Sequence, residues 1–254
     1  MKGRKLGNTG IKVSPLGLGT VKLGRNQAVK YPQAFIIPDD KAARKLLRIA
    51  RDLGINLLDT APAYGNSEQR LGELLKGQTQ NWVICSKVGE EFVGGQSRFD
   101  FTPEYTRASV RRSLQRLQRD YIDIVLVHSD GNDIDIVEQY GTLQVLADLK
   151  GEGLIRAIGF SGKTLEGGLR AAKVADVMMV TYNFEYRDEA ELLNYCATHN
   201  KGVLIKKALA SGHISDDVGA SLRFALQHPA TASVIVGTIN PAHLAANVAA
   251  IDES

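Results

Sequence analysis

The feature that most constrains the fold of this chain is a regular alternation of short β-rich runs with longer amphipathic stretches. Apolar residues, many of them β-branched, gather in the short runs, whereas they recur at helical spacing in the stretches that follow. The expected strands are Leu16-Gly19, Asn56-Asp59, Trp82-Lys87, Ile122-His128, Arg156-Ser161, Val177-Tyr182, Gly202-Lys207 and Ser233-Val236. The expected helices are Asp39-Leu53, Ser67-Lys76, Pro103-Gln118, Ile134-Lys150, Leu165-Lys173, Glu189-His199, Asp217-Gln227 and Pro241-Ile251.

Eight successive strand-helix units in a chain of 254 residues predict one α/β domain, a (β/α)8 TIM barrel over residues 1–254. A doubly wound open sheet is the alternative, but such a sheet rarely needs so many unbroken repeats. The opening residues RKLGNTGIKV, with Gly10 after Asn8-Thr9, predict a short N-terminal β-hairpin before the first barrel strand.

Charge and cysteine content exclude several kinds of partner. The chain has 31 Lys and Arg against 28 Asp and Glu, a net charge of +3, which makes no case for a nucleic-acid or membrane partner. The arginines of RASVRRSLQRLQRD could suggest such a surface, but Val110, Leu114 and Leu117 recur at helical spacing and favour a solvated outer helix face. Cys85 and Cys196 show no metal-ligand spacing. With no signal-peptide pattern and no long apolar run, we expect a soluble cytoplasmic protein without a metal.

Four polar residues are expected to meet at one rim of the barrel, because sites in this fold lie at the carboxyl ends of the strands. Asp59, Lys87 and His128 end three successive strands, and Tyr64 follows in the turn APAYGNSEQ. A cation beside a phenol lowers the pKa of the phenol, which can then protonate a carbonyl oxygen that gains negative charge. His128, as a neutral donor, would orient that oxygen. The group suits carbonyl reduction by hydride from a cofactor; the alternative is a buried polar network without catalytic function.

The residues around these four positions resemble the signatures of the aldo-keto reductase superfamily. The stretch LLDTAPAYGNSEQRLGELLK contains the pattern DTAxxYGxSExxLG, and the SK at 86-87 and the VH at 127-128 fit as well. The likeness runs from Gly3 to about Asn247. It implies a barrel oxidoreductase that uses NADP(H), or alternatively NAD(H), without a Rossmann domain. It also implies that Tyr64 is the general acid, that Lys87 and Asp59 tune it, and that His128 orients the substrate.

The segment AIGFSGKT at 157-164 is one residue short of a phosphate-binding loop, with Ala157 in place of the first glycine. The resemblance implies another reading, because the family's fifth strand ends in a Ser-Asn pair that holds the nicotinamide carboxamide. Ser161 matches the serine, and Gly162 replaces the asparagine. Thr164 then becomes the expected N-cap of the next helix, and a nucleotide triphosphatase is the weaker alternative.

The resemblance further implies the remaining cofactor contacts: Gly19, Thr20, Asp59, Lys206, Leu209, Ser211, Gly212, Gly237, Thr238, His243 and Asn247. Two positions depart from the family at the nicotinamide ring, where Met179 replaces a carboxamide-binding glutamine and Lys206 replaces a stacking aromatic residue. Gly237, Thr238 and His243 stand where the family often has a Lys-Ser pair and an arginine that hold the 2′-phosphate. We therefore expect modest selectivity for NADPH over NADH.

The stretch VKLGRNQAVKYPQAFIIPDD is long for a barrel loop, and loops of this length are often functional. We expect its Tyr31 and Phe35, with Tyr64 and His128, to contact a small carbonyl or alcohol substrate as a partial lid. The alternative is that they pack on the barrel rim. A second functional class is a non-catalytic redox sensor or regulatory subunit that binds the nucleotide, although the complete tetrad favours an enzyme. The sequence leaves the substrate and the oligomeric state open.

Overall fold

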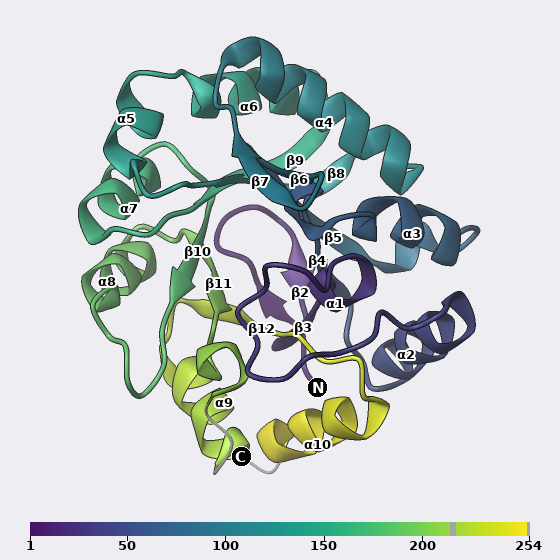
Figure 1. The fold of residues 1–254 in the computed structure, drawn as a ribbon. Coiled ribbons are helices and arrows are strands. Elements are labelled where there is room, and N and C mark those ends of the chain that lie inside the picture. Colours follow the sequence, from purple (N-terminus) through teal and green to yellow (C-terminus); the bar gives the residue numbers. More distant parts are fainter. Residues whose placement is uncertain (214–216, 253–254) are drawn as a thin grey trace.

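The computed structural model describes residues 1–213 and 217–252, and within them eight parallel strands close into a barrel (Figure 1). The strands lie in the order β10-β11-β12-β3-β4-β5-β8-β9 around the barrel, which confirms the predicted (β/α)8 fold. The bounds of β3 (Leu16–Gly19) and β8 (Ile122–His128) are as predicted. The other strands differ from the predictions by one or two residues at an end: β4 (Leu57–Asp59), β5 (Val83–Val88), β9 (Ile155–Ser161), β10 (Val177–Thr181), β11 (Gly202–Lys206) and β12 (Thr231–Val236).

The longer helices form the outer ring around these strands (Figure 1). They are α2 (Asp40–Asp52), α3 (Ser67–Leu74), α4 (Pro103–Leu117), α5 (Asp133–Glu138), α6 (Thr142–Gly151), α7 (Leu165–Ala172), α8 (Ala190–Thr198), α9 (Val218–Gln227) and α10 (Pro241–Asp252). The prediction of one helix over 134–150 is wrong, because the chain breaks between α5 and α6. Gly141 at the break has a φ of +71°, which a continuous helix cannot include. Thr164 caps α7 as expected, since its side chain accepts the backbone N–H of Gly167.

The predicted N-terminal hairpin is confirmed and closes the amino end of the barrel. It pairs β1 (Arg4–Lys5) with β2 (Lys12–Val13), and in Figure 1 it lies behind the strands. Leu6, Ile11 and Val13 are buried among the side chains of the barrel interior. A Cβ atom on Gly7 would lie 2.4 Å from the backbone nitrogen of Gly202, the first residue of β11, so the turn needs glycine there.

Two elements at the carboxyl ends of the strands were not predicted. A second hairpin joins β6 (Glu90–Val93) and β7 (Gln96–Phe99) directly after β5, and a short helix α1 (Val21–Gly24) follows β3. Gly94 and Gly95 form the turn of this hairpin with positive φ angles, a sequence signal that could have revealed it. Both elements, and the loop from α1 to α2, lie in front of the barrel in Figure 1.

The arginines of α4 lie on its outer face, where Arg111 is exposed and Arg107, Arg112 and Arg116 are partly buried. Val110, Leu114 and Leu117 are buried on the opposite face of the same helix. Several of the arginines are paired: Arg112 and Arg116 contact Glu91, and Arg107 contacts Glu152. No helix in the described ranges has both the length and the apolar character needed to cross a bilayer.

Candidate active site

The four predicted catalytic residues meet at the carboxyl ends of β4, β5 and β8. Lys87 Nζ lies 2.6 Å from Asp59 Oδ1 and 2.9 Å from the carbonyl oxygen of Thr60. Tyr64 Oη donates to Asp59 Oδ2 at 3.3 Å, and Lys87 Nζ lies 4.7 Å from the centroid of the Tyr64 ring. The rings of Tyr64 and His128 meet edge to face, with 6.4 Å between centroids. Parallel strands bring residues far apart in sequence to one rim.

The ion pair between Lys87 and Asp59 is buried, since the two residues are 1% and 3% exposed. Burial lowers the pKa of Lys87, but Asp59 and Tyr64 raise it more, so the net pKa lies above the usual value and the lysine stays charged. For Tyr64, burial and the charge of Asp59 raise the pKa more than Lys87 lowers it. The expectation of a depressed tyrosine pKa is therefore wrong for the protein chain by itself. Tyr64 keeps its proton at neutral pH, as a proton donor must.

A close approach of two backbone segments holds Tyr64 in place. Tyr64 ends the 3₁₀ helix η1 (Pro62–Tyr64), and Gly65 follows with a φ of +62°. A Cβ atom on Gly65 would lie 2.2 Å from the carbonyl oxygen of Gly24, and a Cβ atom on Gly24 would lie 2.3 Å from that of Tyr64. Since neither position has room for a side chain, both glycines are required for this turn to lie against α1.

The unpredicted hairpin brings Glu90 to the site. Glu90 Oε2 lies 2.9 Å from His128 Nδ1, although not in line with the Nδ1–H direction, and Glu90 Oε1 accepts from Ser97 Oγ at 2.6 Å. Burial raises the pKa of Glu90, but His128, Ser97 and Arg25 lower it to about 2. Burial lowers the pKa of His128, and Glu90 only partly opposes this. At neutral pH the carboxylate is therefore charged and the imidazole is neutral.

Arg25 is a second residue that the sequence did not reveal. Its guanidinium donates to the carbonyl oxygens of Ala63, Gln27 and Ala28, each at 2.9 Å, and lies 3.7 Å from the centroid of the Phe92 ring. One side chain thus links the first loop, the turn before Tyr64 and the β6–β7 hairpin. Nothing in the local sequence marks these partners, because they come from three separate segments.

The expected nicotinamide end lies at the carboxyl ends of β9 and β11. Lys206 Nζ donates to Ser161 Oγ at 3.0 Å and to the carbonyl oxygen of Gly162 at 2.7 Å. A Cβ atom on Gly162 would lie 2.9 Å from Asp133 Oδ2 and 2.9 Å from Phe160 Cε1, so the asparagine of the family pattern would not fit without rearrangement. Asp133 was also missed: its Oδ2 accepts the backbone N–H groups of residues 163 and 164, both at 2.7 Å.

The other expected cofactor residues lie at neighbouring strand ends. Leu209 precedes the 3₁₀ helix η3 (Ala210–Gly212), and Ser211 and Gly212 lie within it; Ser211 has a φ of +61°. The remaining positions follow β12 or lie on α10: Gly237 is exposed, Thr238 Oγ1 accepts from the backbone N–H of Asn240, His243 is exposed, and Asn247 is buried.

Gly19 and Thr20 lie at the end of β3, next to β4. Both are buried, and Thr20 Oγ1 donates to the carbonyl oxygen of Asp59 at 2.9 Å and lies 2.8 Å from Ser67 Oγ. Within the chain, the hydroxyl of Thr20 therefore links the start of α3 to the strand end that carries Asp59. The structure gives it this positioning contact, which the resemblance did not imply.

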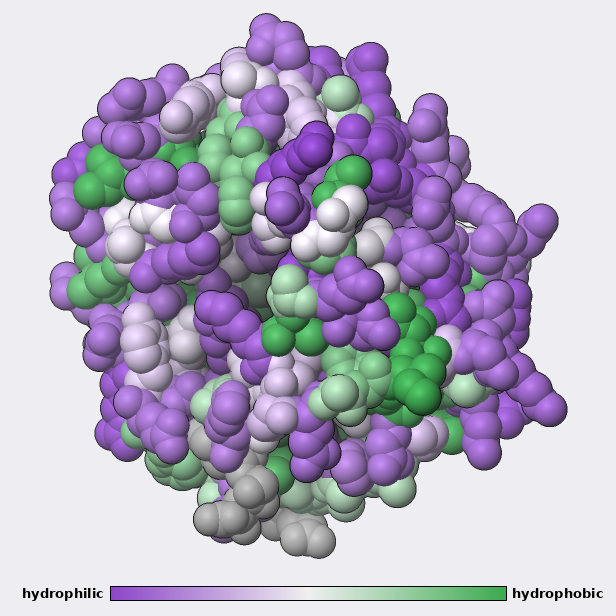
Figure 2. All heavy atoms as spheres, viewed as in Figure 1, coloured by the Kyte–Doolittle hydropathy of each residue, from purple (hydrophilic) through white to green (hydrophobic). Residues whose placement is uncertain are grey.

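The first long loop packs across the mouth of the barrel (Figure 1). Tyr31 and Phe35 contact each other edge to face, and Lys22 Nζ lies 4.2 Å from the centroid of the Tyr31 ring. A Cβ atom on Gly237 would lie 3.0 Å from Tyr31 Oη, so Tyr31 reaches the end of β12. Burial and the charge of Asp59 raise the pKa of Tyr31, which indicates that it also lies near the tetrad. Ile36, in the same loop, is 87% exposed. Figure 2 shows this face with both polar and apolar residues around its centre.

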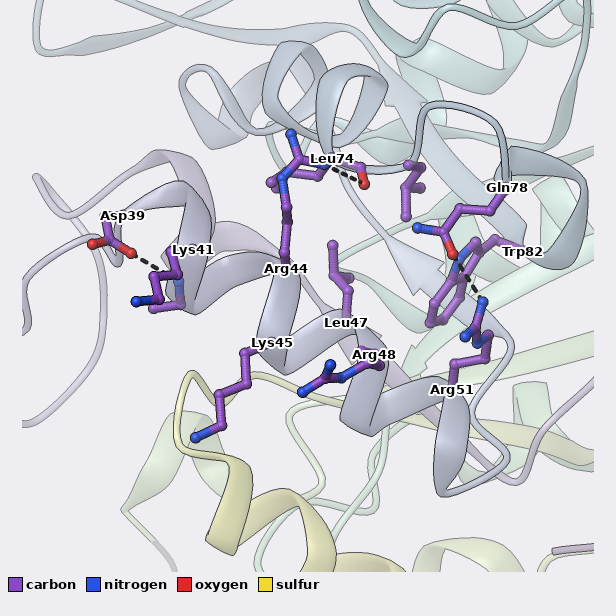
Figure 3. A pocket seen from close by; sticks show the side chains of 12 residues that line it. Asp39, Lys41, Arg44, Lys45, Leu47, Arg48, Arg51, Leu74, Gln78 and Trp82 are labelled. Carbon is purple, nitrogen blue, oxygen red and sulfur yellow. Dashed lines mark hydrogen bonds between the residues drawn. The ribbon is translucent and has the colours of Figure 1, made fainter.

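A groove of about 710 Å³ lies elsewhere, beside α2 and near Trp82 at the amino end of β5 (Figure 3). Its cations include Arg44, which donates to the carbonyl oxygen of Leu74, and Arg51, which donates to Gln78 Oε1. The lining includes no nucleophile paired with a base, and Trp82 in it is 4% exposed. We therefore place the chemistry at the barrel mouth. Across residues 1–213 and 217–252, no cluster of His, Cys, Asp and Glu could hold a metal ion.

Comparisons with known proteins show the family to which this chain is related. The family described as "Aldo/keto reductase family" matches residues 15–219. L-galactose dehydrogenase of Arabidopsis thaliana is 31% identical and covers 98% of this chain and 88% of the relative. The NADH-specific methylglyoxal reductase of Escherichia coli is 31% identical over 86% of this chain and 70% of its own. Two solved structures are similar to this chain. A "putative aldo-keto reductase" from Pseudomonas aeruginosa is 60% identical with a TM-score of 0.91, and the match covers 99% of this chain and 94% of that chain. The holo form of an aldo-keto reductase from Bacillus halodurans is 28% identical with a TM-score of 0.86, and the match covers 100% of this chain and 92% of that chain.

Proposed function

The chain belongs to the aldo/keto reductase family and is an oxidoreductase, and on that premise we propose a specific reaction. We propose that it transfers hydride between a nicotinamide nucleotide and the carbonyl group of a small aldehyde, ketone or sugar, with Tyr64 as the general acid. The observation that carries this proposal is the buried group of Tyr64, Asp59 and Lys87, in which a protonated phenol lies next to a fixed ion pair.

The residues at the nicotinamide end fit such a nucleotide. Ser161 Oγ and Lys206 Nζ offer an acceptor and a donor beside each other, which suits a carboxamide. Residues 209–212 and 237–247 would hold the phosphates and the adenine. Gly237 and Thr238 provide no cation for a 2′-phosphate, so we propose that both NADPH and NADH bind, with modest selectivity. When bound, the nucleotide supplies or accepts the hydride.

Tyr64 would give its proton to the substrate oxygen as hydride adds to the carbonyl carbon, so the products are an alcohol and the oxidised nucleotide. Lys87, 4.7 Å from the phenol ring, would stabilise the phenolate that remains until solvent returns the proton. Asp59 keeps Lys87 charged and fixed in position. For an alcohol or sugar substrate the same groups act in reverse.

A panel of small aldehydes and sugars, assayed through the absorbance of NADH and NADPH, tests this proposal. We expect turnover of some substrate by the wild type and none above background by Tyr64→Phe. The second candidate is a nucleotide-binding redox sensor, which the unusual Lys206 and Gly162 favour. Nucleotide binding without turnover of any carbonyl or alcohol would support the sensor and contradict the enzyme.

A further inference from the structure

The end of β11 carries a mostly buried lysine whose closest partners are uncharged. Lys206 Nζ donates to the hydroxyl of Ser161 and to the carbonyl oxygen of Gly162. No ion pair to Lys206 occurs in the part of the chain that the structure describes. By contrast, Lys87 on β5 is paired with the carboxylate of Asp59. The charged or titratable groups that act on Lys206 from neighbouring elements are Glu189, Lys207, Lys87, Asp133 and His128.

An unpaired cation in such a position costs folding free energy, since water is replaced by weaker partners. Burial accordingly lowers the pKa of Lys206 to about 8. At neutral pH most molecules still carry the charge, and the charge is lost as the pH rises through about 8. A flexible apolar side chain would fill the same space without this cost. We therefore expect the amino group of Lys206 to interact with a bound ligand.

The neighbouring positions lack the amide side chains that could hold a carboxamide. Met179 on β10 is apolar and packed inside the barrel, and Gly162 has no side chain. Contacts with Asp133 and Phe160 leave no room for one at position 162. Lys206 Nζ is then the donor beside Ser161, and it can donate to the carbonyl oxygen of a carboxamide while Ser161 Oγ accepts from the amide N–H.

We propose that Lys206 is a specificity-determining residue that holds the nicotinamide carboxamide and makes the site prefer the reduced over the oxidised nucleotide. This inference rests on the proposed function, because it requires the ring to lie beside Ser161. The dihydronicotinamide ring is neutral, whereas the oxidised ring carries a positive charge. A lysine cation near the ring in a poorly solvated site repels only the oxidised form. Lys206 would thus promote release of the oxidised product and favour the reductive direction.

Isothermal titration calorimetry with NADH, NAD⁺, NADPH and NADP⁺ tests the proposal without turnover. We expect the wild type at pH 7 to bind each reduced form about tenfold or more tighter than its oxidised form, as like-charge repulsion at short range allows. Lys206→Gln keeps a donor and removes the charge, so the ratio should fall towards one, mainly because the oxidised forms bind more tightly. Lys206→Arg keeps the charge and should keep the preference.

Lys207→Gln is the matched control. It removes the same charge from the adjacent residue, which is exposed and whose carbonyl oxygen accepts from Asn183. This variant should change the affinity for both redox forms alike and leave their ratio unaltered. The wild type provides a test that needs no variant: the ratio should decrease as the pH is raised through about 8, where Lys206 loses its proton.

A reduced-to-oxidised preference in Lys206→Gln within about twofold of the wild-type ratio would overturn this inference and leave the proposed reaction intact. A wild-type ratio near one at pH 7 would do the same. If the wild type bound neither redox form of either nucleotide, the proposed function itself would fall, and the inference with it.

Discussion

Glu90 Oε2 lies 2.9 Å from His128 Nδ1 but out of line with the Nδ1–H direction, and this proximity favours one tautomer of the imidazole. Because a charged carboxylate can only accept, we predict that the neutral ring carries its proton on Nδ1 and leaves Nε2 as an acceptor. This differs from the expected role of His128 as a neutral donor to a carbonyl oxygen. With this tautomer, His128 would accept from the hydroxyl of an alcohol substrate and would donate through Nε2 only when the ring is protonated.

Replacement of Glu90 by glutamine tests this assignment. Because Glu90 raises the pKa of His128 against the effect of burial, we expect a still lower pKa in Glu90→Gln. If the titration of His128 causes the acidic limb of the pH–rate profile, that limb should move to lower pH. Nitrogen-15 NMR of the ring should report the Nδ1–H tautomer in the wild type and a larger share of Nε2–H in the variant, since an amide can donate to Nδ1. An Nε2–H tautomer in the wild type at neutral pH would contradict the assignment.

Tyr64→Phe should lower kcat by at least about a hundredfold, the usual loss when a general acid is removed. The affinity for the nucleotide, measured by calorimetry, should change little, because the hydroxyl contacts Asp59 and faces the substrate in the proposed reaction. Reduction of a good substrate within about tenfold of the wild-type rate would remove Tyr64 from the proposed role.

Lys87→Met should destabilise the protein as well as inactivate it. The substitution leaves Asp59, 3% exposed, without its cation, at a cost of about 3–5 kcal/mol in the free energy of unfolding. The double variant Lys87→Met/Asp59→Asn also removes the unpaired charge of Asp59. It should therefore recover much of that stability while remaining inactive. Denaturant unfolding of the wild type and both variants checks this, and equal stability of the wild type and Lys87→Met would contradict it.

Gly65→Ala should reduce both stability and turnover, because it forces a side chain into the approach of Gly24 and an unfavourable φ on the residue after Tyr64. The backbone alone accounts for about 1–3 kcal/mol. Gly77→Ala is the control, since Gly77 also has a positive φ, of +77°, but no neighbour within 4 Å of an added Cβ. If Gly65→Ala lowers the melting temperature more than Gly77→Ala does, the difference is the steric contribution of the contact with Gly24. Equal decreases would show that this contact adds no cost in stability.

His243→Arg should raise the preference for NADPH over NADH by about tenfold, through a fixed cation for the 2′-phosphate at the start of α10. Ala242→Arg adds the same charge to the adjacent exposed residue and controls for a general effect of net charge. Dissociation constants for both nucleotides decide the matter. An equal rise in both variants would mean that the phosphate does not lie beside position 243.

The sequence by itself determined the barrel and which four polar residues meet at its rim. Both depend on local information: hydrophobic periodicity marks each strand and helix, and a parallel barrel brings all strand ends to one rim. The hairpin from Glu90 to Phe99 carries such a local signal in Gly94-Gly95, and so does the helix break at Gly141.

Only the tertiary structure decided the electrostatics of the site. The contacts of Glu90 with His128 and of Lys206 with Ser161 join residues that are 38 and 45 positions apart, and no periodicity predicts which side chains will touch at such separations. The pKa of Tyr64 shows the same limit. The sequence indicated that Lys87 would lower it, but burial, which outweighs that effect, depends on every segment packed around the phenol.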